Sequence, residues 1–253
     1  MTVDYAVDIE EMQEVINLAN PRVAKNVTLV TPKELGVTSL LHISLDKRTT
    51  LFPNISKRAG MSEDNTLPRV HAGITLAGCW SGYATGGEKA VNTIVVNTKE
   101  KQSNNKAISS VYKGGFYIHE IDFRCGLKPN KQLVYDANFT DEVWLATYNP
   151  LTRSFKAKIV GIIFPSSVTY FPRTGSYPLE VTTLCVKIEK GCTIKLTDKK
   201  THFKPEKDTA EFLTEGYWKF KISDSHDIGD LESIKKEEFE DLKLLSAALL
   251  SHM

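Results

Sequence analysis

Residues 40–84 read LLHISLDKRTTLFPNISKRAGMSEDNTLPRVHAGITLAGCWSGYA and hold the densest set of unusual residues in the chain. Leu40–Ser44 is a short apolar run with one histidine, which predicts a buried strand. Residues 56–68 are charged and rich in turn formers, which predicts an ordered polar loop. Arg69–Ile74 predicts a second strand, and the small residues of Thr75–Tyr83 predict a helix directly after it. A buried histidine, a polar loop and a strand-to-helix corner are together typical of a pocket wall.

The rest of the chain predicts many short strands between two helices. Asp8 is placed to cap a helix over Ile9–Ala19, whose apolar residues recur at helical spacing. Leucines recur in the same way over Asp230–Leu250, which predicts a C-terminal helix. Between residues 27 and 222, β-branched and alternating runs are interrupted by proline and glycine, as in short strands. We therefore expect an α+β protein with a split, mainly antiparallel sheet.

This reading divides the chain into three consecutive parts. We expect an N-terminal helical segment over residues 1–26, an α+β core over 27–222 and a C-terminal helix within 223–253.

Composition excludes several classes of protein. The 32 basic and 31 acidic side chains nearly cancel, which argues against a general nucleic-acid binder or a polybasic membrane binder. No run reaches the roughly 18 apolar residues that a membrane-spanning helix needs, and the N-terminus lacks the pattern of a signal peptide. The four cysteines are scattered and the histidines lack metal-ligand spacing, so we expect neither disulfides nor a metal site. These features predict a cytoplasmic protein.

The order of elements around residues 40–84 resembles the ADP-ribosyltransferase fold. In that family a strand carrying His or Arg precedes a second strand, then a helix that starts with Ser or Thr and small residues, and later a strand with a catalytic Glu. Leu41–Ser44 is similar to the first element, residues 69–79 to the second, and Asp141–Leu145 to the third. The resemblance covers about residues 38–165, and the strands expected over 166–222 are additional to it.

The resemblance implies a transferase that uses NAD as substrate, moves ADP-ribose to a protein or nucleic-acid acceptor, and releases nicotinamide. Glu142 would be catalytic, binding the nicotinamide ribose and stabilising an oxocarbenium-like centre. His42 would also be catalytic and would hydrogen-bond an NAD ribose, its ring held by a neighbouring backbone carbonyl. The further NAD contacts would come from Ser44, Arg69, Thr75 and Tyr83.

The same residues also have a scaffold interpretation. His42 would then be a half-buried histidine satisfied by the strand around it, and Glu142 an exposed carboxylate paired with a lysine. Arg69 would hold Glu63 or Asp64 in the preceding loop instead of a diphosphate. The two hydroxyl residues would be a strand-end group and a helix N-cap.

The chain departs from the family pattern at three places. Ile43 follows the histidine where Gly or Ala is usual, and Thr140 stands where arginine-modifying members carry Glu. The aromatic residue that stacks on nicotinamide has no clear match among Val70, His71 and Tyr83. A rival hypothesis is therefore a non-catalytic interaction protein on a degenerate transferase-like scaffold.

The run at residues 63–70, EDNTLPRV, also resembles uncharacterised small proteins of phages and bacteria. The rival hypothesis accordingly predicts a phage-encoded protein that binds host or phage proteins in the host bacterial cytoplasm. The leucines of the C-terminal helix would either contact a partner or a second copy, or cover the protein's own sheet. These leucines are Leu242, Leu245, Leu249 and Leu250.

Overall fold

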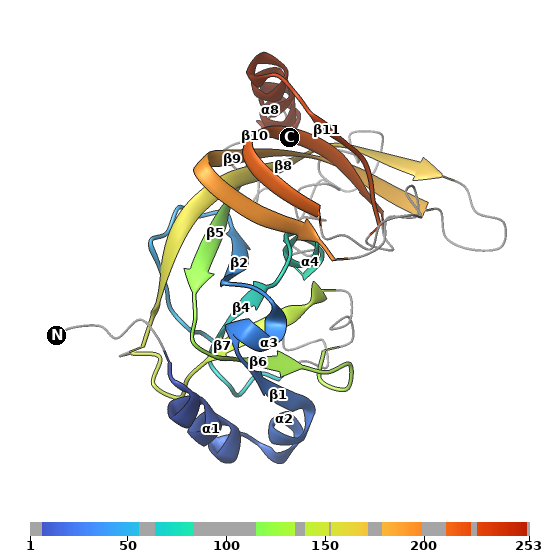
Figure 1. The fold of residues 1–253 in the computed structure, drawn as a ribbon. Coiled ribbons are helices and arrows are strands. Elements are labelled where there is room, and N and C mark those ends of the chain that lie inside the picture. Colours follow the sequence, from blue (N-terminus) through green and yellow to red (C-terminus); the bar gives the residue numbers. More distant parts are fainter. Residues whose placement is uncertain are drawn as a thin grey trace. The chain divides into compact units, whose positions relative to one another are not determined.

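The computed structural model describes residues 7–55, 64–82, 115–134, 140–151, 153–171, 179–198, 211–223 and 227–251, with backbone alone at 168–171, 179–180 and 247–251. Its helices, drawn in Figure 1, are α1 (Ile9–Leu18), α2 (Pro21–Asn26), α3 (Pro32–Leu35), α4 (Leu76–Gly82) and α8 (Lys236–Ser251). Its strands are β1 (Val27–Val30), β2 (Ser39–Ser44), β3 (Thr50–Leu51), β4 (Arg69–Gly73), β5 (Phe116–Asp122), β6 (Gly126–Pro129), β7 (Glu142–Ala146), β8 (Phe155–Phe171), β9 (Leu179–Thr197), β10 (Glu211–Ser223) and β11 (Ile228–Ser233).

The strands form an 11-stranded, mostly antiparallel sheet. The strand order is β1-β6-β7-β4-β2-β5-β8-β9-β10-β11, and β3 pairs with β8 beside this path. The predicted α+β class with a mainly antiparallel sheet is therefore confirmed. No helix in the described ranges is long and apolar enough to span a membrane.

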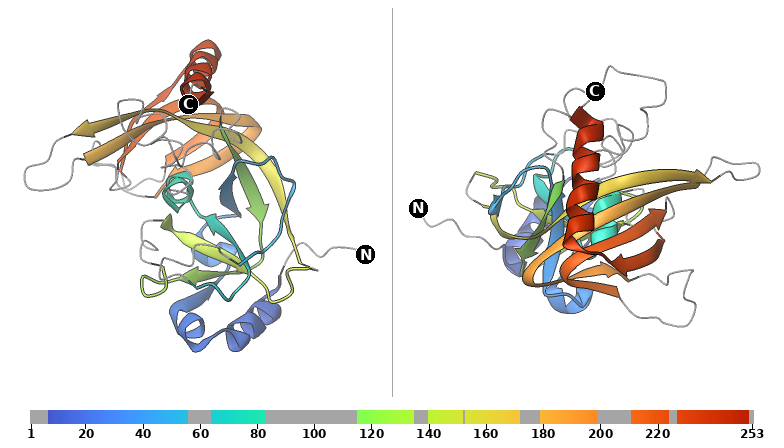
Figure 2. Two further views of the ribbon diagram at one scale, coloured as in Figure 1. Left: turned by 180° about the vertical axis from the view of Figure 1, so that it is seen from behind. Right: turned by 90° about the horizontal axis from the view of Figure 1, so that it is seen from above.

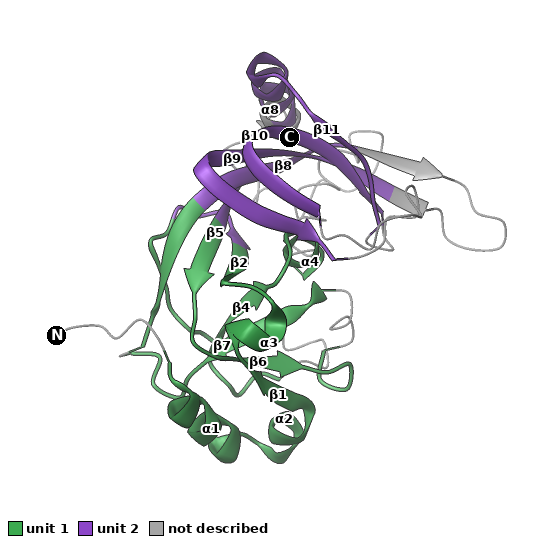
Figure 3. Cartoon of the chain, in the orientation of Figure 1, with its two compact units in different colours: residues 1–42, 48–82, 119–159 green, residues 43–47, 83–118, 160–253 purple. Residues whose placement is uncertain are grey.

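The chain divides into two compact units that are interleaved in sequence (Figure 3). Unit 1 contains residues 1–42, 48–82 and 119–159. Unit 2 contains residues 43–47, 83–118 and 160–253. The three parts expected from the sequence were consecutive, whereas each of these units is built from three separate stretches of the chain.

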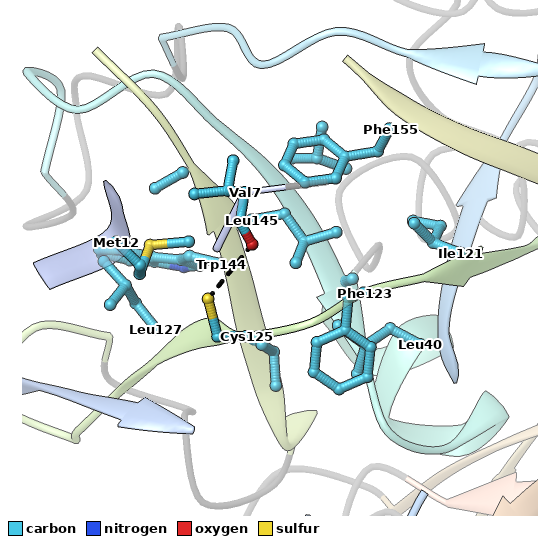
Figure 4. Close-up of a cluster of buried hydrophobic side chains, with 14 of the residues drawn as sticks. Val7, Met12, Leu40, Ile121, Phe123, Cys125, Leu127, Trp144, Leu145 and Phe155 are labelled. Atoms are coloured by element: carbon cyan, nitrogen blue, oxygen red, sulfur yellow. Dashed lines mark hydrogen bonds between the residues drawn. The ribbon is translucent and has the colours of Figure 1, made fainter. Parts of the chain in front are cut away.

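Unit 1 has an apolar core in which β7 is central. Trp144 and Leu145 of β7 are both fully buried, and because neighbours in a strand project to opposite faces, both faces of β7 are covered. Figure 4 shows Trp144 beside Met12 of α1 and Leu127 of β6, with Leu145 in another part of the same cluster. This packing fixes β7 on both sides, so the residues at its start are held on a rigid element.

Helix α1 forms where its sequence predicts it. The side chain of Asp8 accepts a hydrogen bond from the Glu11 backbone N–H at 2.8 Å, which caps the helix. Met12 and Val15 are its buried residues, and they join the core of unit 1. The predicted amphipathic helix is thus a packing element of this unit.

The described part of unit 2 includes β8 from Val160 onward, β9 and β10, with α8 packed on them (Figure 2). Phe239 of α8 is 1% exposed, and its ring lies 5.1 Å from that of Phe164 and 5.0 Å from that of Tyr217. The Ser246 hydroxyl donates to the Pro165 carbonyl at 3.0 Å. Helix α8 therefore covers part of its own sheet, while Leu245 remains 60% exposed.

The predicted start of the C-terminal helix at Asp230 is wrong. Residues Ile228–Ser233 form β11, which pairs antiparallel with β10, and α8 begins only at Lys236. Asp230 has a positive φ of 52°, so its backbone does not have helical geometry. Leu231 lies in β11 and matches the helical spacing of the later leucines only by coincidence.

Candidate functional site

Three neighbouring strands of the sheet carry the predicted catalytic residues His42 and Glu142. Strand β4 lies between β7, which begins with Glu142, and β2, which carries His42. Gly73 of β4 lies opposite Glu142, and Leu41 of β2 lies opposite Gly73. His42, His71 and Glu142 all belong to unit 1, so the arrangement can be described within one unit.

The carboxylate of Glu142 is held by two side chains. The indole Nε1–H of Trp144 donates to Oε1 of Glu142 at 2.7 Å. Nδ1 of His71 contacts the same oxygen. Because a carboxylate can only accept, Nδ1 of His71 carries the proton in this contact. Both of these contacts, which lie within the described residues, are made by Oε1.

Regular strand pairing explains why these three side chains meet. His71 lies opposite Trp144, and Gly73 lies opposite Glu142, in the β4–β7 pair. Residues that are opposite or two apart project from the same face of an antiparallel pair. The rings of His71 and Trp144 accordingly meet edge to face, with centroids 6.2 Å apart.

Backbone conformation sets where Glu142 begins its strand. Asp141 has a φ of 46°, in the left-handed region that costs energy for most residues but is tolerated by Asp and Asn. Its carboxylate lies 3.7 Å from Nζ of Lys128. The turn at Asp141 therefore directs the chain into β7, and Glu142 is the first residue of the regular pairing.

The charge of Glu142 is stabilised although the side chain is only 11% exposed. Burial by itself raises the pKa of a carboxyl group. Here the hydrogen bond and charge of His71, the hydrogen bond from Trp144 and the charge of Arg69 outweigh burial and lower the pKa of Glu142 below its ordinary value. Glu142 is thus a fixed, ionised carboxylate with few exposed atoms.

His42 is tied to the central strand. Its Nδ1 lies 2.7 Å from the carbonyl oxygen of His71 and donates to it, because a carbonyl can only accept. Because Leu41, Gly73 and Glu142 are in register, strict alternation directs the His42 side chain to the face opposite Glu142. Its ring contacts the main-chain carbonyl of β4 and not the side chain of His71. The expected backbone carbonyl is present, and Nε2 of His42 is left as an acceptor.

Other basic side chains lie near His42. Its ring lies 6.0 Å from that of the fully buried His119, whose Nε2 accepts from the Arg48 backbone N–H at 3.2 Å. Burial, with the nearby charges of His119, His71 and Arg48, lowers the pKa of His42 from 6.5 to about 4, against the opposing hydrogen bond to His71. His42 is therefore neutral at pH 7 and acts as a hydrogen-bonding group rather than as a cation.

This burial of neutral His42 predicts an acid-labile fold. Unfolded His42 takes up a proton near pH 6.5, whereas folded His42 takes it up only near pH 4, so its contribution is complete above 6.5 and is lost as pH falls towards 4. Between about pH 7 and about pH 5, we expect this residue to remove about 2 kcal/mol from the free energy of unfolding, measured by urea denaturation. His42→Asn keeps an N–H for the His71 carbonyl but cannot titrate, so its pH dependence should be shallower. Equal slopes in the two proteins would contradict the prediction.

Arg69 belongs to the scaffold. Its side chain is fully buried, and Nη1 lies 3.2 Å from Oδ2 of Asp64. Nη2 donates to the Asp64 carbonyl at 2.9 Å, and the guanidinium lies 3.9 Å from the centroid of the Trp144 ring. The prediction of Arg69 as a diphosphate contact is therefore corrected, because a guanidinium without exposed surface cannot reach a ligand. The alternative partner, Asp64, is the one found.

Two other predicted contacts also have local partners. Thr75 is 3% exposed, and its hydroxyl accepts from the Gly78 backbone N–H at 3.0 Å, as a helix-capping group does. The hydroxyl of Ser44 donates to the Asp46 carbonyl at 2.7 Å, and Ser44 belongs to unit 2. Tyr83 lies outside the described residues.

Helix α4 packs closely on the end of β4. A Cβ on Gly78 would lie 2.3 Å from the Thr140 carbonyl, and a Cβ on Gly73 would lie 2.7 Å from Sγ of Cys79. The Cys79 thiol donates to the Leu41 carbonyl at 3.1 Å, and burial raises its pKa to about 12. Cys79 is therefore a protonated packing residue and not a nucleophile.

Two of the predicted site residues keep an atom for a ligand: the neutral imidazole of His42 on β2 and the ionised carboxylate of Glu142 on β7, the strands that flank β4. In the described ranges no group of three or more His, Cys, Asp or Glu side chains is placed to hold a metal ion. No family model, curated protein or solved structure matches the chain. The site must therefore be interpreted from its own geometry.

Sequence reasoning did not assign roles to His71 and Trp144, although both touch Glu142. A partial signal was present for Trp144, because it stands two residues after Glu142 in a strand and so shares its face. For His71 the necessary information was the register of β4 on β7, which a single sequence does not contain.

Proposed function

We propose that this protein is an NAD-dependent ADP-ribosyltransferase, with Glu142 and His42 as its substrate-binding groups. The observation that carries the proposal is that Glu142 is bound by the His71 side chain and His42 by the His71 main-chain carbonyl, both on the strand between them. The family resemblance implies a strand that carries a histidine, a strand followed directly by a helix of small residues, and a strand that carries a glutamate. Here β2 and β7 are the two neighbours of β4 in the sheet, and α4 follows β4 directly.

Glu142 is suited to the role that the resemblance implies. Loss of nicotinamide from NAD develops positive charge on the ribose, and a fixed carboxylate close to that charge lowers the barrier. Trp144 and His71 orient the carboxylate through Oε1, so no reorganisation of Glu142 is needed when the charge develops. Oε2 would accept a hydroxyl hydrogen of the nicotinamide ribose.

His42 would contribute binding rather than acid–base chemistry. With its pKa lowered to about 4, the ring is neutral at pH 7, and its Nδ1–H is used by the His71 carbonyl. Nε2 can accept from a ribose hydroxyl of NAD. A neutral, pre-oriented acceptor of this kind favours a sugar over a phosphate.

A second candidate is a binding protein without catalysis on the same scaffold. It is favoured because two predicted NAD contacts have partners within the protein: Arg69 is paired with Asp64, and Thr75 caps α4. In this case His71, Trp144 and Glu142 would be a structural network, and partner contacts would lie elsewhere.

Titration of the protein with NAD in a calorimeter, followed by chromatographic detection of free nicotinamide, tests the proposal. We expect saturable binding of one NAD per chain and slow nicotinamide release. We expect His42→Ala to weaken binding by about tenfold, the cost of about one hydrogen bond. Ser44→Ala serves as the matched control, because its hydroxyl is used by Asp46 in the other unit. If the wild-type protein shows no heat of binding and releases no nicotinamide, the transferase proposal is wrong and the binding-protein hypothesis is favoured.

A further inference from the structure

We infer that His71 is the general base that activates the acceptor of ADP-ribose, and that this acceptor is a hydroxyl group. The inference rests on the proposed function, because it assigns a second reacting group to the same site. Its starting point is that His71 and Glu142 form a carboxylate–imidazole dyad across β4 and β7.

The dyad fixes the tautomer of His71. Oε1 of Glu142 accepts from Trp144 at 2.7 Å and from Nδ1 of His71, so the proton of a neutral His71 ring is on Nδ1. Nε2 then carries a basic lone pair, as in dyads where a carboxylate orients a histidine base. Packing of the ring against the edge of Trp144 holds its orientation.

Exposure distinguishes the two members of the dyad. The side chain of His71 is 37% exposed, whereas that of Glu142 is 11% exposed. Nδ1 contacts Glu142, so Nε2 is the ring nitrogen that remains for an acceptor molecule. An acceptor molecule can therefore reach His71 while Glu142 remains shielded with the ribose.

The class of acceptor follows from what stands beside the dyad. Arginine-modifying transferases carry a second Glu two residues before the catalytic one, but here that position is Thr140, which is 2% exposed. A hydroxyl acceptor, in contrast, is a weak nucleophile until a base removes its proton.

Three neighbouring titratable groups are less suited to the role of this base. Glu142 of β7 is 11% exposed, His42 of β2 is bound to the His71 carbonyl, and burial raises the pKa of the Cys79 thiol of α4 to about 12. Arg69, whose charge also acts on Glu142, is a cation and not a base.

The step balances without a further reactant. The acceptor oxygen forms a bond to C1 of the nicotinamide ribose as the bond from C1 to the nicotinamide nitrogen breaks. The electron pair of the broken bond neutralises the pyridinium ring, which leaves as nicotinamide. The proton of the acceptor hydroxyl moves to Nε2 of His71. Water in place of the acceptor gives hydrolysis of NAD by the same route.

Two variants test this inference with NAD and water as the simplest acceptor. His71→Asn keeps an N–H donor for Glu142 but has no basic nitrogen, so we expect turnover to fall about 10²- to 10⁴-fold, with NAD affinity changed by less than about threefold. In His71→Ala, added imidazole should restore part of the turnover, which a purely structural role for His71 would not allow. His71→Asn with wild-type turnover overturns the inference alone, as does a His71→Ala protein that imidazole fails to rescue.

Failure of the proposed function gives a different result. If the wild-type protein neither binds nor hydrolyses NAD, both proposals are overturned together. Nitrogen NMR of His71 then reports whether the dyad itself exists, because a proton on Nδ1 and none on Nε2 is expected in neutral His71 with or without NAD. A proton on Nε2 would overturn the dyad as well.

Discussion

Glu142→Gln should lower nicotinamide release at saturating NAD by about 10²- to 10³-fold, the scale of losing one group that stabilises charge in a transition state. The amide is isosteric with the carboxylate, and its oxygen still accepts from Trp144 and His71. What it lacks is the negative charge that faces the developing positive charge on ribose. Its NH2 group also replaces Oε2 and cannot accept a ribose hydroxyl. We therefore expect the main loss in kcat, a loss of NAD affinity of about tenfold for that hydrogen bond, and a melting temperature close to that of the wild-type protein.

Asp141→Asn is the matched control for that experiment. It removes a carboxylate from the neighbouring residue, and Asn tolerates the positive φ of 46° at this position as well as Asp does. Because the carboxylate of Asp141 lies 3.7 Å from Nζ of Lys128 and Asn keeps a polar group there, nicotinamide release should be unchanged. A Glu142→Gln protein that releases nicotinamide at the wild-type rate would contradict the role assigned to Glu142. Equal losses in both variants would point to a non-specific charge effect.

Local patterns were sufficient to predict the elements around this site. The apolar run with one histidine forms β2, the run from Arg69 forms β4, and the small residues that follow form α4. Each has a short-range cause, such as the β-branched content of a strand or the hydroxyl of Thr75 at the helix start. The same reasoning was wrong at Asp230, where leucine spacing continued through a strand whose pairing with β10 is not local.

The chemistry of the site depended on pairings that a single sequence does not contain. Arg69 was assigned two alternative partners from the sequence, and only the structure distinguishes them, because its burial depends on how Trp144 packs above it. His71 acquires its place in the dyad from the register of β4 on β7. A shift of one residue in that register would turn His71 to the opposite face from Glu142.

The buried pair of Asp64 and Arg69 should be a major source of stability in unit 1. We expect Asp64→Ala to lower the free energy of unfolding by about 3–5 kcal/mol, because it removes a carboxylate that is paired with a buried guanidinium. The side-chain exposures are 3% for Asp64 and 0% for Arg69. Asp64 also accepts from the Leu67 backbone N–H at 2.8 Å and from the Thr66 hydroxyl at 2.6 Å, so its removal releases the loop before β4. Urea denaturation followed by tryptophan fluorescence measures the change.

Burial, and not distance, decides the size of this effect. Lys221 and Asp230 are closer, at 2.6 Å, but their side chains are 49% and 64% exposed, so Lys221→Ala should cost less than about 1 kcal/mol. Replacing both members of the buried pair, in Asp64→Ala with Arg69→Met, removes the stranded charge and should restore part of the stability lost by Asp64→Ala alone. The opposite result is a double variant with a lower free energy of unfolding than Asp64→Ala. It would show that the contacts of Arg69 with Trp144 and the loop carbonyls stabilise the strand independently of the ion pair.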